Sequence, residues 1–109
     1  MAYDETLAAR IRAVLRDDDR VTERKMFGGI AFMLGGNMAC GVIKEDLMVR
    51  VGPDAHDEAL AEPHVRPMDF AGKPMRGMVY VDAQGPASEA DLERWVRAGA
   101  SFAATLPAK

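Results

Sequence analysis

Hydrophobic residues near the N-terminus repeat with the period of a helix. The stripe is formed by Leu7, Ile11, Val14 and Leu15, and the nearby arginines lie largely off it. Asp4 stands where a helix cap is expected, and the three consecutive aspartates at 17–19 oppose the helix dipole. The pattern therefore predicts an amphipathic helix over residues 4–17, followed by a loop.

Farther along the chain the hydrophobic period shortens to that of strands. Apolar runs at 30–34 and 38–43 are separated by Gly35-Gly36-Asn37, which predicts a three-residue hairpin loop, and a third run follows at 47–51. These runs predict an antiparallel meander with one buried face. Alternation assigns to that buried face Ile30, Phe32, Leu34, Met38, Cys40, Val42, Leu47, Val49 and Val51.

The second half of the chain predicts a helix, two strands and a closing helix. A short helix runs from Pro53 to about Ala61, a weak strand from Val65 to Phe70, and a stronger strand from Gly77 to Val81. Pro67 confines the weak strand to a sheet edge or a bulge. Ser88, with Asp91 three residues later, caps the last helix. The order α-β-β-β-α-β-β-α predicts an α+β fold, a two-layer sandwich with an antiparallel sheet, as a single domain over residues 1–109.

Composition and charge narrow the function classes. The chain has 109 residues, a net charge of −3 and a pI near 5.3, which argues against a dedicated nucleic-acid binder. Its single cysteine excludes an internal disulfide. The charged N-terminus has no apolar signal-peptide core, so a cytoplasmic location is expected.

The stretch from Met26 to Ile43 is apolar and long enough to be weighed as a membrane span. Five glycines interrupt it, however, and Gly-Gly-Asn at its centre is typical of a turn. The hairpin explains this stretch better than a transmembrane helix does, and no membrane association is expected.

Few residues of the sequence are candidates for catalysis or for binding a cofactor or a metal. No glycine pattern matches a phosphate-binding loop, and His56 and His64 with one cysteine make a poor zinc set, so neither a cofactor nor a metal is predicted. Cys40 lies in the middle of a predicted strand, where packing is the favoured interpretation. A small ligand-binding or enzymatic domain centred on Cys40 stays open as an alternative.

Two groups of residues are candidates for interaction. A basic set, which would bind phosphate if its members converged, consists of Arg24, Lys25, Arg66, Lys73 and Arg76. Met33 and Met48 fall on the second face of the predicted sheet, with Ala31 and Ala39, where an apolar patch would pair with another chain. The first group favours a nucleic-acid-associated regulator, and the second favours a protein partner or a homodimer.

Two segments carry a family resemblance. KMFGGIAFMLGGNMACGV followed by LMVRVG, together with PHVRPMDFAGKPMRGMVYVD, resembles the N-terminal domain of the TfoX/Sxy family of bacterial competence regulators. The glycine-rich segment supplies a structural motif, which comprises Met26, Phe27, Gly28, Gly29, Gly35, Gly36 and Asn37. The downstream pieces Arg66-Pro67-Met68 and Gly77-Met78 add to the match.

The resemblance implies a two-layer α/β fold and a role beside the cyclic-AMP receptor protein in regulating DNA-uptake genes, with no catalytic residues. It also implies a two-domain design, of which this chain would be the stand-alone N-terminal domain without the helical C-terminal domain. We therefore expect a non-enzymatic, cytoplasmic domain for regulation through protein interaction, linked to transcription or competence, with a protein partner still to be identified.

Overall fold

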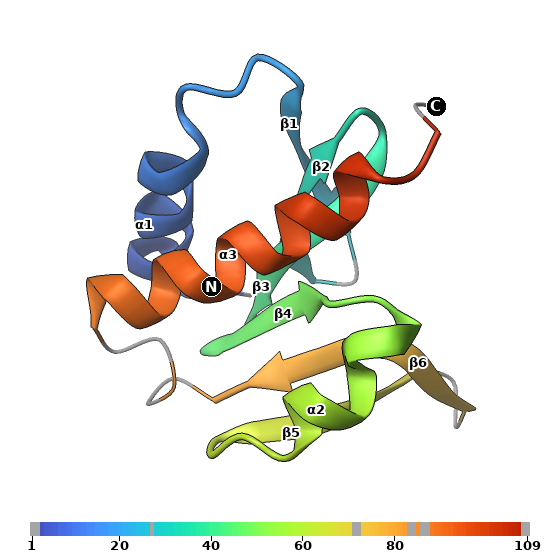
Figure 1. Cartoon of the computed structure of the whole chain (residues 1–109). Helices are drawn as coiled ribbons and strands as arrows, with labels where there is room; N and C mark the ends of the chain where they lie inside the picture. Colours follow the sequence, from blue (N-terminus) through green and yellow to red (C-terminus); the bar gives the residue numbers. More distant parts are fainter. Residues whose placement is uncertain (1–2, 27, 71–72, 83–84, 86–87, 108–109) are drawn as a thin grey trace.

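The computed structural model describes residues 3–26, 28–70, 73–82, 85 and 88–107, with only the backbone described at residues 26, 68–70 and 73–76. Within these residues, six antiparallel strands form one sheet in the order β1-β2-β3-β4-β6-β5. The strands are β1 (Val21–Met26), β2 (Gly29–Leu34), β3 (Asn37–Ile43), β4 (Asp46–Arg50), β5 (Val65–Phe70) and β6 (Lys73–Val81). Figure 1 shows β1 and β5 at opposite ends of the sheet.

The helices of the described chain pack on one face of this sheet (Figure 1). They are α1 (Glu5–Leu15), α2 (His56–Leu60), which follows a 3-10 turn at Pro53–Ala55, and α3 (Glu89–Ala104). The core contains residues of all three helices, among them Ile11, Ala59 and Trp95, together with strand residues such as Phe32 and Val79. The opposite face carries no described helix and is called here the helix-free face.

Both long helices begin at the caps that the sequence predicts. The carboxylate of Asp4 accepts hydrogen bonds from the amides of Thr6 and Leu7, at 2.9 and 3.1 Å. The hydroxyl of Ser88 accepts one from the amide of Asp91, at 3.1 Å. These bonds satisfy amides that have no partner inside the helix, so each cap fixes where its helix starts.

The predicted α+β class and the succession of helices and strands are confirmed. The structure adds β1, which pairs with β2 along six residues, where the sequence analysis placed only a loop. Four of the β1 residues, from Thr22 to Lys25, are exposed and polar, so β1 lacks the apolar alternation that identifies a half-buried strand.

The glycine pair between β2 and β3 forms a tighter turn than predicted. Gly35 and Gly36 both have positive φ, 61° and 86°, as a two-residue hairpin loop requires. Asn37 is the first residue of β3 and pairs with Leu34, so it does not belong to the loop. Its buried side chain donates a hydrogen bond of 2.9 Å to the backbone carbonyl of Pro107.

A bulge in β3 places two residues on the faces opposite to those predicted. Phe32 pairs with Cys40 and Met33 pairs with Met38, so Ala39 is an extra residue in β3. The alternation therefore shifts by one. Ala39 joins the buried residues near α3, while Met38 packs on the helix-free face, contrary to the prediction for both.

The apolar stretch considered as a membrane span lies in strands. The part of residues 26–43 that the structure describes belongs to the end of β1, to β2 and to β3. Across the described portion of the chain, no helix has the length and hydrophobicity to cross a membrane.

Candidate functional site

One row of side chains crosses the helix-free face from edge to edge. The strand registers align these residues, one from each strand: Arg24, Ala31, Gly41, Met48, Tyr80 and Arg66. Directly opposed residues of antiparallel strands point to the same face. The row is therefore small and apolar at its centre and has an arginine at each end.

Methionines form a second, smaller hydrophobic cluster on this face. Met48 and Met78 are buried, with 1% and 6% of their surface exposed, and Met38, Ile43 and Tyr80 pack against them while staying partly exposed. The Cε atom of Met48 lies where a side chain at position 41 would stand, so Gly41 makes room for it. Met48 is thus the buried residue on which the partly exposed side chains of this surface pack.

The structure separates the two methionines that the sequence analysis grouped as an interaction patch. Met33 is partly exposed on the helix-free face, whereas Met48 is buried within the single chain. Ala31 and Ala39 are buried as well, and Ala39 lies with residues that face α3. The residues that offer apolar surface to a partner are Met33, Met38, Ile43 and Tyr80. The sequence analysis did not assign Tyr80 to this surface, because the sequence does not show that β6 pairs with β4.

The arginine at the β5 end of the row is neutralised. Arg66 forms ion pairs of 2.7 Å with both Asp46 and Asp82, and its guanidinium carbon lies 5.2 Å from the ring centroid of Tyr80. The hydrogen bonds to Asp82 and Asp46 raise the pKa of Arg66. The guanidinium is therefore already engaged by two carboxylates and an aromatic ring.

The members of the basic set whose side chains the structure describes do not converge on one site. Arg24 on β1 and Arg66 on β5 lie at opposite edges of the sheet. The side chains of Lys73 and Arg76 are outside the described residues. Lys25 pairs with Ile30 and so points to the helix face, whereas Arg24 pairs with Ala31 and points to the helix-free face. Both are exposed, and neither makes an ion pair within the described residues.

The structure describes only part of the glycine motif. Phe27 and the side chain of Met26 lie outside the described residues. Gly28 has a φ of 75° in the turn between β1 and β2, and a side chain at Gly29 would collide with the carbonyl oxygen of Val42 in β3. The described part of the motif thus brings three strand backbones close together.

Cys40 is fully buried in the core, opposite Phe32 on one neighbouring strand and Val49 on the other. Burial raises the pKa of its thiol to about 12. A thiol in this state is protonated at neutral pH and is not nucleophilic. The side chain of His56 is engaged elsewhere, since its Nδ1 accepts a 2.9 Å hydrogen bond from the amide of Gly77.

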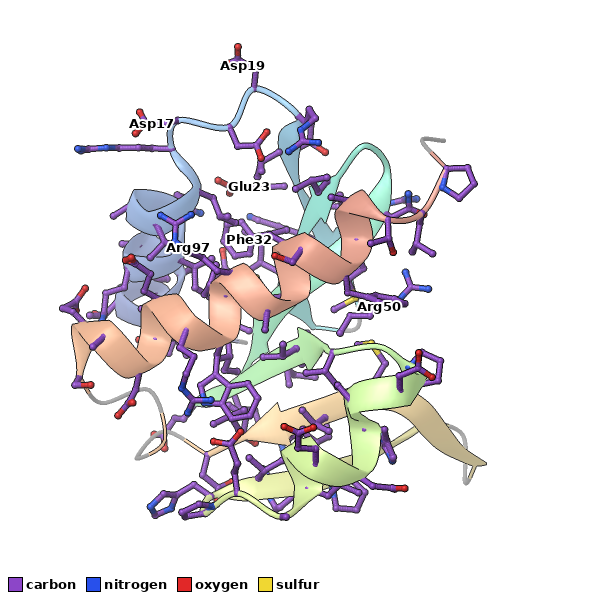
Figure 2. The ribbon with its side chains drawn as sticks, viewed as in Figure 1. Asp17, Asp19, Glu23, Phe32, Arg50 and Arg97 are labelled. Carbon is purple, nitrogen blue, oxygen red and sulfur yellow. The ribbon has the colours of Figure 1, made fainter. Side chains whose placement is uncertain are left out.

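A surface hollow of about 550 Å³ lies between the end of α1, the α1–β1 loop and α3. Figure 2 marks Asp17 and Asp19 on the loop and Arg97 on α3, and all three line the hollow. Asp18 is bound by Arg20 at 3.0 Å, which lowers the pKa of Asp18. The described lining residues include no cysteine, histidine, serine or lysine, and no cluster of metal-ligating side chains occurs in the described structure.

Comparison with known proteins gives one match. Residues 13–103 match the family model of the TfoX N-terminal domain, which covers most of the chain. No curated protein and no solved structure gives a significant match.

Proposed function

Because the chain belongs to the TfoX N-terminal domain family, a family of competence-related regulatory domains, we propose that it is a non-enzymatic, cytoplasmic domain that regulates through protein interaction. Its partner binds the helix-free face. The observation that carries the proposal is the partly exposed apolar surface of Met33, Met38, Ile43 and Tyr80 on a sheet face without a described helix. Of these, Met38, Ile43 and Tyr80 pack against buried Met48 and Met78, and Met33 pairs with Met38.

Several features of this surface suit protein binding. Methionine side chains are flexible and polarisable, so a methionine-rich surface adapts to a partner's shape. Tyrosine supplies rigid apolar area with a polar tip, a combination that is enriched at interfaces. Charged groups lie at the rim, with Arg24 at one end of the row and the Arg66 ion pairs at the other. An apolar centre with a polar rim is the usual anatomy of an interface.

The alternatives have weaker support. A nucleic-acid regulator needs converging cations, and Arg24 and Arg66 lie at opposite edges while two carboxylates hold Arg66. A domain with thiol chemistry at Cys40 needs an accessible thiolate, and this thiol is buried with a raised pKa.

The test is affinity capture with matched variants. The full chain and the Met33→Lys/Ile43→Lys variant are used as bait in cell extract, with and without nuclease, and captured proteins are identified by mass spectrometry. Ala98→Lys/Ser101→Lys, which adds the same two charges on the exposed side of α3, is the control. We expect one protein that the wild type and Ala98→Lys/Ser101→Lys retain after nuclease treatment and that Met33→Lys/Ile43→Lys loses. Retention by all three baits, or loss on nuclease treatment, contradicts the proposal.

A further inference from the structure

The two edges of the sheet differ in their capacity to accept another strand. At the β5 edge, Pro67 has no amide hydrogen, and the register shifts between Pro67 and Asp69. The amide of Asp82 donates to the carbonyl of His64, so by alternation the ring of Pro67 points away from β6. This edge is therefore closed to pairing. The β1 edge has no proline, and its register runs without a shift from Val21 to Met26.

The alternation of backbone hydrogen bonds identifies the free groups on β1. The amide of Gly35 donates a 3.1 Å hydrogen bond to the carbonyl of Arg20, which sets the phase of the β1–β2 ladder. Thr22 and Arg24 then turn their backbone groups toward β2. Val21, Glu23 and Lys25 turn theirs outward. The amide of Val21 already donates a 3.2 Å hydrogen bond to the carbonyl of Asp18, so Glu23 and Lys25 are the residues that present both an amide and a carbonyl to an incoming strand.

The charges on β1 select the kind of strand that fits. The carboxylate of Glu23 is held by Arg12 through bonds of 2.7 and 2.8 Å, so its charge is offset within the chain. Arg24 and Lys25 have no such partner in the described structure. The exposed edge thus carries two uncompensated cations, one on each face of the sheet.

We propose that β1 is a docking edge for an extended acidic segment of a partner protein, which adds to the sheet as a further strand. Opposed residues share a face, so the groups facing Arg24 and Lys25 are consecutive in the partner. The segment therefore holds two adjacent Asp or Glu residues within a run of strand-forming residues, without proline at its paired positions. A second copy of β1 fits less well, because it brings the same uncompensated cations to the interface.

This inference rests on the proposed function and adds the chemistry of a partner segment at a second surface. The probe is the blocked peptide Thr-Val-Glu-Glu-Val-Thr, titrated into the full chain and followed at each backbone amide by NMR, with Thr-Val-Lys-Lys-Val-Thr as the control peptide. We expect the acidic peptide to shift the amides of Glu23 and Lys25 more than those of Thr22 and Arg24. The lysine peptide leaves them unchanged.

Variants test the charge and the backbone separately. Arg24→Glu/Lys25→Glu lowers the affinity about tenfold or more, because two attractive pairs become repulsive. Lys25→Pro removes one outward amide without removing a β1–β2 bond, and it also weakens binding. Lys44→Glu, in the β3–β4 turn, reverses one exposed charge away from β1 and leaves the affinity unchanged, so it is the control.

Three outcomes overturn the inference. The first is the absence of shifts in β1 at millimolar peptide. The second is a set of β1 shifts that depends on protein concentration without peptide, which assigns the edge to a second copy of the chain. The third is a set of shifts confined to the helix-free face, which would assign the binding site of the acidic segment to that face. None of these affects the capture test with Met33→Lys/Ile43→Lys, so failure at the edge is distinct from failure of the proposed function.

Discussion

Gly99 of α3 lies directly against the backbone carbonyl of Ala39, the extra residue of the bulge in β3. A methyl group at position 99 would collide with that carbonyl oxygen. The bulge therefore turns Ala39 toward the helices, and the absence of a side chain at Gly99 lets α3 approach the sheet there. The two residues together set the distance between the two layers at this point.

We expect Gly99→Ala to destabilise the protein although alanine favours helices. Alanine stabilises an exposed helix position by about 1 kcal/mol relative to glycine. Here the methyl group has to displace α3 from β3, and such overpacking costs about 1–3 kcal/mol. Urea denaturation should give a lower free energy of unfolding for Gly99→Ala. Ser101→Ala, on the exposed side of the same helix, is the control and should be neutral or slightly stabilising. A rise in stability for Gly99→Ala would contradict the packing described here.

The same bulge marks the limit of prediction from the hydrophobic pattern. Strict alternation placed Cys40 and Val42 correctly on the core face, because the pairing with β2 is regular there. It failed at Met38 and Ala39, since one extra residue reverses every side chain on the far side of it. The local hydrophobic pattern does not mark this bulge, and the contact between Ala39 and Gly99 joins residues that are far apart in the sequence.

We expect Asn37→Ala to lower the free energy of unfolding by about 1–2 kcal/mol, because the part-buried carbonyl of Pro107 loses its donor. The bond ties the start of β3 to the segment after α3. Amide exchange at Thr105 and Leu106 should therefore become faster as well. Thr105→Ala removes only an exposed hydroxyl bond to Phe102 and should change stability by less than about 0.5 kcal/mol. Equal stability of Asn37→Ala and wild type would show that this bond contributes nothing.

The ion pair between Arg12 and Glu23 predicts a dependence of stability on pH. The hydrogen bond from Arg12 lowers the pKa of Glu23 below its ordinary 4.5. Stabilisation by this pair is therefore complete above the unfolded-state pKa and is lost as the pH falls through the lower folded-state pKa. Both side chains are more than one-third exposed, so the effect is at most about 1 kcal/mol.

Chemical denaturation over a pH series tests this dependence. Glu23→Gln should be less stable than wild type near neutral pH, and the two proteins should converge in acid. Glu58→Gln on α2 is the control, since the exposed Glu58 makes no ion pair within the described residues. A difference between wild type and Glu23→Gln that stays constant with pH would show that the carboxylate charge is not responsible.

The candidate surface was less predictable than the fold. The sequence pointed to Met33 and Met48 as neighbours on one face, but a strand pattern does not say how far a side chain is covered by its neighbours. Tyr80 and the ion pairs of Arg66 depend on β6 lying between β4 and β5, and this order is a long-range pairing. The β1 edge was missed because its residues are polar, although Val21 and Thr22 at its start are β-branched and favour a strand.

The thiol of Cys40 should react only when the protein unfolds. The side chain is fully buried, and burial raises its pKa to about 12. In the unfolded chain the thiol has its ordinary pKa near 8.5, so the reactive thiolate forms there first. Stabilisation from the protonated buried thiol is complete below that value and is lost as the pH rises toward about 12. Reaction with a thiol reagent at mildly alkaline pH should therefore follow the population of the open state.

A labelling time course with increasing urea tests this coupling. We expect slow labelling of the native protein and a rate that rises in proportion to the unfolded fraction. Ser101→Cys in a Cys40→Ala background places the single thiol on the exposed side of α3 and should react at once without urea. Rapid labelling of wild type in native buffer would show that Cys40 is accessible. Such a result would restore the thiol-centred alternative and weaken the assignment of this domain to protein interaction alone.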